Sequence, residues 1–280
     1  MNKIAESASS LTNGNVSDAN LSVVIPVYNE AATLPIVVTK LIQIGTAEIV
    51  IVDDCSTDTT FAVGNELAAK HPQIQIVRHE KNRGKTAALL TGFSLTKGDI
   101  VIVQDADLEY DPTEIPLLIE PILQGHADVV YGSRFLVRRA ARVLYFYHFL
   151  ANKFLTFLSN LLTNLNMTDI ETGYKAFRGD IIRNMVITSS GFGFEVEATA
   201  KIAKLKCAVY EVPISYYGRT YEEGKKIGLL DGIEAVWLVV RFNLLTSLKS
   251  SFRNFSDKST VVDRSSTQSS EAPQMQPRQQ

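Results

Sequence analysis

LSVVIPVYNE (21–30) and EIVIVDD (48–54) are short, apolar, β-branched segments that end in polar or acidic side chains. The same pattern returns three times further along, in IQIV (74–77), DIVIVQDAD (99–107) and DVVYGS (128–133). Segments of this length and composition are typical of buried strands. Between them, apolar residues recur with helical spacing over 30–44, 57–70, 86–95 and from Pro112 onward. This alternation predicts an α/β fold with a mostly parallel central sheet and helices on both faces.

The composition is that of an ordinary globular protein. Of 280 residues, 45% are hydrophobic, and 28 Lys and Arg nearly balance 30 Asp and Glu. A chain without a basic surplus lacks the charge that nucleic-acid binding requires, so no nucleic-acid partner is expected. Two cysteines cannot form a disulfide framework, and the first 20 residues lack the apolar core of a secretory signal. Both observations favour a cytoplasmic location.

The two ends of the chain differ from its middle. Residues 1–20 are rich in Ser, Asn and Ala, and residues 251–280 are mostly polar. Such segments bury too little apolar surface to offset the entropy of ordering. We therefore expect disordered ends around one domain that spans 21–250.

Acidic residues follow three of the predicted strands. They are Glu30 after the first, Asp53 and Asp54 at the second, and Asp105 to Glu109 at the fourth. Ligands bind beyond the carboxyl ends of strands in such sheets, and converging carboxylates repel unless a cation joins them. Asp105 and Asp107 occupy alternate positions of an extended strand end, so both side chains are expected to point the same way, which suits Mg²⁺ or Mn²⁺. The alternative is that these residues cap the helices that follow.

Two competing nucleotide-binding motifs are absent. Gly84-Lys85-Thr86 is similar to the end of a Walker A motif, but His79 stands where that motif needs a glycine. The first strand–helix turn also lacks a GxGxxG pattern. The sequence therefore argues against P-loop ATPases and Rossmann dehydrogenases.

Four segments in order carry a family resemblance: LSVVIPVYNEAATL, IVIVDDCSTDTT, KNRGKTAALLTG and DIVIVQDADLEYDP. They resemble the landmarks of family 2 glycosyltransferases with a GT-A fold. Further on, GSRF, TDIETGYKAFR and YYGRTYEEGKKI are similar to the dolichyl-phosphate mannose synthase branch and its bacterial relatives. The resemblance covers residues 21–230.

The resemblance implies a role for individual residues. Asp105, Asp107 and Glu109 would hold Mg²⁺ or Mn²⁺, and Asp105, Asp107, Arg134 and Arg219 would be catalytic. Which of Lys225 and Lys226 contacts phosphate stays open. The implied donor-binding set is Pro26, Tyr28, Glu30, Val52, Asp53, Asp54, Asp105, Ala106, Asp107, Arg219, Lys225 and Lys226.

The implied reaction is inverting transfer of a hexose from a GDP-mannose or UDP-glucose type donor to a polyprenyl or dolichyl phosphate. A phosphate ester is already charged near neutral pH, so this nucleophile needs no strong base. The alternative is a soluble family 2 enzyme that acts on a sugar, lipid or protein hydroxyl. Asp169 and Glu171 are then the candidate bases, unless they serve in helix capping or salt bridges.

The segment after the fifth strand suggests contact with a membrane. Arg134, Arg138, Arg139 and Arg142 precede the apolar stretch 143–165, which His148, Lys153 and three asparagines interrupt. One lysine at the centre of a span costs about 2.5–3.5 kcal/mol, so an amphipathic helix in the headgroup plane fits better. The alternative is a core helix under the sheet.

A second apolar stretch, 229–248, carries three charged residues and also fails as a span. We therefore expect the protein to associate peripherally with the inner face of the membrane. Arg134, Arg138, Arg139, Arg142 and His148 would form its acceptor-phosphate or membrane face. A membrane-anchoring subunit is a further candidate partner.

Overall fold

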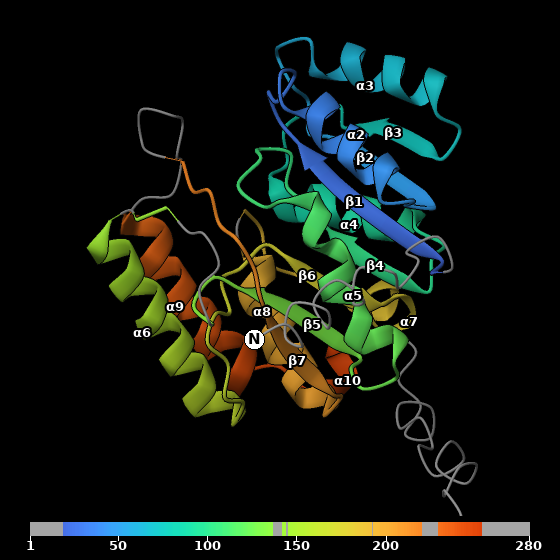
Figure 1. The fold of residues 1–280 in the computed structure, drawn as a ribbon. Coiled ribbons are helices and arrows are strands. Elements are labelled where there is room, and N and C mark those ends of the chain that lie inside the picture. The colour runs from blue at the N-terminus through green and yellow to red at the C-terminus, as the bar shows by residue number, and fades with distance from the viewer. Residues whose placement is uncertain (1–18, 137–141, 144, 192, 220–228, 254–280) are drawn as a thin grey trace, which may run out of the picture.

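The computed structural model describes residues 19–136, 142–143, 145–191, 193–219 and 229–253 (Figure 1). A seven-stranded sheet with the order β3-β2-β1-β4-β6-β5-β7 forms its centre. Among the described strands β6 alone is antiparallel to its neighbours, so the expectation of a mostly parallel sheet is confirmed. The strands are β1 Leu21–Val27, β2 Glu48–Asp53, β3 Ile74–Arg78, β4 Ile100–Val103, β5 Val129–Ser133, β6 Lys175–Arg178 and β7 Val209–Pro213.

Helices cover both faces of this sheet, and each face has its own apolar core. On one face lie α2 (Leu34–Gln43), α3 (Thr60–Lys70), the 3-10 turn Pro112–Glu114 and α5 (Ile115–Leu123). On the other lie α4 (Lys85–Leu95), α7 (Gly179–Asn184) and α8 (Phe194–Leu205). In β1, β2, β4 and β5 the β-branched side chains alternate between the two cores, as expected for strands buried on both faces.

A further pair of helices lies outside α8. The helices α6 (Phe146–Thr163) and α9 (Leu229–Leu244) pack side by side, away from the sheet (Figure 1). The short α10 (Leu248–Ser251) follows, and the buried Phe252 bridges to Met185. Ser251 and Phe252, the first residues of the predicted tail, are buried against the domain.

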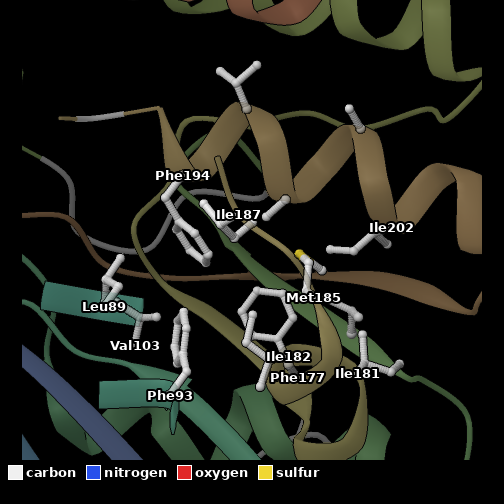
Figure 2. Close-up of a cluster of buried hydrophobic side chains, with 14 of the residues drawn as sticks. Leu89, Phe93, Val103, Phe177, Ile181, Ile182, Met185, Ile187, Phe194 and Ile202 are labelled. Atoms are coloured by element: carbon white, nitrogen blue, oxygen red, sulfur yellow. The ribbon is translucent and has the colours of Figure 1, made fainter. Parts of the chain in front are cut away.

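Aromatic packing joins β6 and α8 on the second face (Figure 2). The ring of Phe194 lies 5.5 Å from that of Phe93 and 6.3 Å from that of Phe177, and all three are buried. Leu89 and Val103 complete the part of this cluster nearest to β4. The cluster packs the start of α8 against α4 and the sheet. The polar residues at the starts of α4 and α8 are therefore held in defined positions.

The predicted fourth strand is too long at its carboxyl end. β4 ends at Val103, and the chain turns at Ala106 and Asp107, with Leu108 in the left-handed region at φ 64°. The Gln104 side chain closes this turn by donating hydrogen bonds to the carbonyls of Asp105 and Tyr110. Asp105 and Asp107 therefore do not lie at alternate positions of a strand, as predicted, and the turn positions their side chains instead.

Candidate active site

Most of the predicted site residues gather at one edge of the sheet. All strands except β6 end at this edge, and β6 begins there because it runs in the opposite direction. The edge therefore collects the residues after β1, β4, β5 and β7, and also the residues before β6. This position beyond the strand ends is where α/β sheets bind ligands.

Arg219 connects three of the predicted acidic residues. Its guanidinium lies 2.8 Å from Asp107 Oδ2 and 3.2 Å from Glu30 Oε1. Its backbone N–H donates to Glu109 Oε1 at 2.7 Å, and the hydroxyl of Tyr216 donates to Glu109 Oε2 at 3.0 Å. The structure thus brings Glu30, Asp107, Glu109 and Arg219 together, although they come from three separate parts of the chain.

Asp105 has a different partner, which the sequence analysis did not assign to the site. The Nζ of Lys85 lies 2.8 Å from Asp105 Oδ1 and 2.9 Å from Oδ2. It also lies 3.4 Å from Glu195 Oε1, at the start of α8. Burial lowers the pKa of Lys85, but Asp105 and Glu195 together raise it well above its ordinary value, so the ammonium stays charged. The Gly84-Lys85-Thr86 sequence was the available signal.

Asp107 lies close to two other negatively charged carboxylates, Asp105 and Glu109. Burial, and then the charges of Asp105 and Glu109, raise the pKa of Asp107 to about 7 in spite of Arg219. A bound cation relieves such repulsion, and carboxylate oxygens are the ligands that Mg²⁺ and Mn²⁺ prefer. No three His, Cys, Asp or Glu side chains form a ready metal cluster within the described ranges. Asp105 and Asp107 fit a metal held by two carboxylates, whereas both oxygens of Glu109, the third predicted ligand, accept hydrogen bonds from Tyr216 and Arg219.

Arg134 is held by a buried partner. Its Nε and Nη2 donate to the two oxygens of Asp169 at 2.6 and 2.8 Å, and its guanidinium lies over the ring of Tyr216 at 5.1 Å. Asp169 is fully buried. The structure therefore shows Asp169 in a salt bridge, which is the alternative role left open for it.

Two further titratable groups, Glu171 and Lys175, lie just before and at the start of β6; Lys175 is fully buried and its Nζ donates to the carbonyls of Ile170 and Thr172. Burial and the nearby Glu195 raise the pKa of Glu171 to about 7, whereas burial lowers the pKa of Lys175 to about 8. Glu171 Oε1 is buried without a hydrogen-bond partner. Sequence reasoning missed Lys175 and Glu195, because a lysine in a strand and a glutamate at a helix start have no distinctive spacing.

The predicted nucleotide-side residues surround the ends of β1 and β2. Pro26 lies in β1 and Tyr28 follows this strand, both partly exposed, whereas Val52 and Ala106 are buried in the cores.

The two aspartates at the end of β2 have partners within the protein. Buried Asp53 pairs with Arg78 at 3.1 Å. The carboxylate of Asp54 lies 2.7 Å from His79 Nδ1 and accepts hydrogen bonds from the backbone of Arg83 and Gly84. Contacts of these residues with a nucleotide stay a prediction.

The predicted acceptor face is only partly described. Arg138, Arg139, Lys225 and Lys226 lie outside the described residues. The exposed Arg142 donates to the carbonyl of Gly218 at 3.3 Å. His148 lies in the first turn of α6, with its ring 5.5 Å from that of Tyr145.

The outer surface of α6 and α9 is apolar. Large hydrophobic side chains recur along it every three or four residues, which keeps them on one side of each helix. No helix in the described part of the chain is long and apolar enough to cross a membrane. The exposed residues are Phe146, Tyr147, Leu150, Phe154, Phe157 and Leu161 of α6, and Ile233, Trp237 and Leu244 of α9.

Solved structures with the same architecture identify the fold class. Glucosyl-3-phosphoglycerate synthase from Mycobacterium tuberculosis in complex with UDP superposes with a TM-score of 0.64 at 19% identity, over 82% of each chain. The same enzyme in complex with Mg²⁺ and UDP gives a TM-score of 0.64 at 20% identity, over 84% of this chain and 83% of that one. The fold is the GT-A fold of glycosyltransferases.

Sequence comparisons then identify the family. The profile of glycosyl transferase family 2 matches residues 22–186, and the chain belongs to this family. An undecaprenyl-phosphate mannosyltransferase of Micrococcus luteus is 32% identical over 232 residues, which cover 79% of this chain and 93% of that protein. A polyprenol monophosphomannose synthase of Mycolicibacterium smegmatis is 30% identical over 74% of this chain and 80% of that protein. The protein is a glycosyltransferase of the branch that contains these synthases.

Proposed function

We propose that this glycosyltransferase moves a hexose from a GDP-mannose or UDP-glucose type donor to the phosphate of a polyprenyl phosphate, with inversion and with Mg²⁺ or Mn²⁺. The observation that carries the proposal is the paired charge at the sheet edge. Asp105 and Asp107 lie beside Lys85 and Arg219, in a chain similar to polyprenyl-phosphate mannosyltransferases.

Each charged group has a defined task in this reaction. Asp105 and Asp107 would hold the metal, which stabilises negative charge on the leaving diphosphate when it is bound. Arg219 is only partly buried, and its guanidinium would stabilise the negative charge on the same leaving diphosphate. Arg134, fixed by Asp169 and Tyr216, would position the acceptor phosphate. The phosphate nucleophile is already ionised, so this reaction requires no general base.

We also propose that the enzyme works at the cytoplasmic face of a membrane, as a peripheral protein. Contiguous apolar surface on a protein marks an interaction site, and a polyprenyl chain resides in lipid. The exposed apolar side chains of α6 and α9 would lie at the headgroup level. Arg142 precedes α6 and would meet lipid phosphate. Membrane anchoring by another subunit is compatible with this arrangement.

A hydroxyl acceptor is the second candidate, because one observation favours it. Glu171 is a carboxylate with a pKa of about 7 and an unpartnered oxygen, and a general base works best near the operating pH. This alternative predicts transfer to a water-soluble acceptor without any requirement for lipid.

Radiolabelled transfer separates the two functions. GDP-mannose, UDP-glucose and UDP-GlcNAc are each incubated with the enzyme, Mn²⁺ or Mg²⁺, and a short polyprenyl phosphate, and label in the organic phase is counted. Label from one donor supports the proposed reaction and identifies that donor. Donor hydrolysis without lipid labelling contradicts the polyprenyl acceptor and favours a hydroxyl acceptor.

The variant Asp107→Ala tests the metal-binding role. We expect a loss of about 10³-fold or more in turnover, because a carboxylate that stabilises transition-state charge through a metal is removed. The fold should remain intact by circular dichroism, since Asp107 lies in a turn and not in either core. Retention of metal-dependent turnover would contradict the assignment of Asp107.

A further inference from the structure

Lys85 lies between two carboxylates that come from distant parts of the chain. It is the first residue of α4, and its Nζ lies 2.8 Å from Asp105 and 3.4 Å from Glu195. A positive charge at a helix N-terminus is unfavourable, because the backbone N–H groups there carry partial positive charge. The two carboxylates therefore hold the ammonium in a place that α4 by itself disfavours. Glu195 lies in the first turn of α8, and the N-terminal end of a helix favours a negative charge.

The short contacts make Lys85 a competitor of any metal at Asp105. Both oxygens of Asp105 lie within 2.9 Å of the ammonium, so a divalent cation at that carboxylate would lie close to the positive charge of Lys85 and be repelled by it. An ammonium displaced without a new partner would be a poorly solvated charge, which is costly. Glu195 is the second partner, because a small shift of the flexible lysine side chain shortens the existing 3.4 Å distance.

We propose that Lys85 is a positioning residue that exchanges partners when the metal binds. It neutralises Asp105 in the metal-free protein and moves to Glu195 when a divalent cation takes Asp105. This inference rests on the metal dependence within the proposed function. Glu195 then forms the salt bridge with the displaced Lys85 ammonium. Glu195 therefore favours metal binding at Asp105 without being a metal ligand.

Titration with Mn²⁺ alone, followed by the electron paramagnetic resonance of the free ion, tests the exchange without relying on activity. The full chain is compared with Lys85→Met, Glu195→Gln and the double variant. We expect Lys85→Met to bind Mn²⁺ about fivefold more tightly, because the competitor is gone, and Glu195→Gln about fivefold more weakly. In the Lys85→Met background the Glu195→Gln change should alter the affinity by less than about twofold, since there is no lysine to receive.

The matched control is Lys40→Met. Lys40 pairs with Asp111 at 3.0 Å, further along the segment that carries Asp105 and Asp107, and has no contact with Asp105. We expect its Mn²⁺ affinity to equal that of the unmodified protein. If Lys40→Met raised the Mn²⁺ affinity as much as Lys85→Met, the loss of any nearby positive charge would explain the increase, and the inference would be overturned.

Two other results separate failure of the inference from failure of the metal-dependent function. Additive effects of Lys85→Met and Glu195→Gln, in a protein that binds Mn²⁺ and transfers sugar, overturn the exchange alone. Absence of Mn²⁺ binding together with transfer in EDTA overturns both. A crystal structure with Mn²⁺ needs no variant: Lys85 bonded to Glu195 supports the exchange, and Lys85 still bonded to Asp105 refutes it.

Discussion

At the scale of single residues, Gly173 shows how tightly the site is built. A Cβ at this position would lie 2.7 Å from Asp105 Oδ2 and 3.3 Å from Lys85 Nζ. The carboxylate therefore rests against bare backbone just before β6 begins. The glycine belongs to the TDIETGY segment, whose other members Asp169 and Glu171 are also buried charges of the site.

Gly173→Ala should therefore damage activity more than stability. The added methyl group displaces the Asp105 carboxylate and its lysine partner, and small misplacements of reacting groups cost about 10²-fold in rate. We expect kcat/KM for lipid-phosphate transfer to fall by about 10- to 100-fold with a nearly unchanged Tm. Gly232→Ala is the control, because a Cβ there has open space. Wild-type kinetics in Gly173→Ala would show that Asp105 needs no such fixed position.

At the scale of elements, α6 connects the apolar outer surface to the site. Its polar residues face inward and hold the chain that leads to Asp169. The amide of Asn160 donates to the carbonyl of Met167 at 2.7 Å, and Lys153 donates to that of Thr168 at 3.1 Å. Two of the residues that interrupt the apolar stretch, Lys153 and Asn160, therefore tie α6 to the segment before Asp169. The helix lies on the surface, packed against α9, and not directly under the sheet.

The exposed row of α6 carries a prediction about membrane binding. We expect the double variant Phe154→Ser/Phe157→Ser to sediment with anionic liposomes several-fold less than the unmodified protein, because two apolar anchors are removed. Both side chains are more than half exposed, at 55% and 64%, so the Tm should change little. Leu123→Ser on α5, where the residue is 50% exposed, should bind as before. Equal sedimentation of all three proteins would remove lipid as the partner of α6.

Arg138, Arg139 and Arg142 belong to the same question. Replacing these three residues with Gln should lower binding to anionic liposomes and leave binding to neutral ones unchanged, because the contribution is electrostatic. Sedimentation at low and high salt distinguishes this effect from that of the aromatic row. Unchanged binding would leave the arginines without a role at a lipid surface.

At the scale of the whole molecule, Glu171 and Lys175 make stability depend on pH, because desolvation shifts the pKa of each group. The folded-state pKa of Glu171, about 7, is raised above its ordinary value of 4.5. Below pH 4.5 the carboxyl is protonated in both the folded and the unfolded state. As the pH rises towards 7, the unfolded chain loses its proton first, so the stability contributed by this group is lost. Lys175 has a lowered pKa, and its contribution increases as the pH rises above about 8.

Glu171→Gln removes the first of these effects. We expect the Tm of the variant, relative to that of the unmodified protein, to be higher at pH 8 than at pH 5, because only the unmodified protein must ionise a buried carboxyl. A difference of 1 kcal/mol corresponds to about 2–4 °C for a domain of this size. Thermal unfolding at both pH values measures the effect. A Tm difference that is the same at pH 5 and pH 8 would mean that Glu171 titrates normally.

Much of the fold follows from local pattern. The five predicted strands and the helices between them match β1 to β5 of the structure, apart from errors at their ends, but β6, β7, α7 and α8 were not predicted. Strands that are buried on both faces of a parallel sheet require continuous runs of β-branched residues, and such runs can be recognised in the sequence. The end of β4 was misplaced because Val103 and Gln104 carry no breaker, and the turn depends on hydrogen bonds from a side chain.

The sequence by itself determined the fold class and which strand ends carry acid, because these depend on neighbouring residues. Only the tertiary structure decided which charges meet. Asp105 pairs with Lys85 and not with Arg219, and Glu195 and Lys175 join the site from α8 and β6. The reason is the direction of β6, which begins at the carboxyl edge and places Gly173 and Tyr174 beside Tyr110 and Asp111, 63 positions earlier. Contacts across such distances leave no periodic signal.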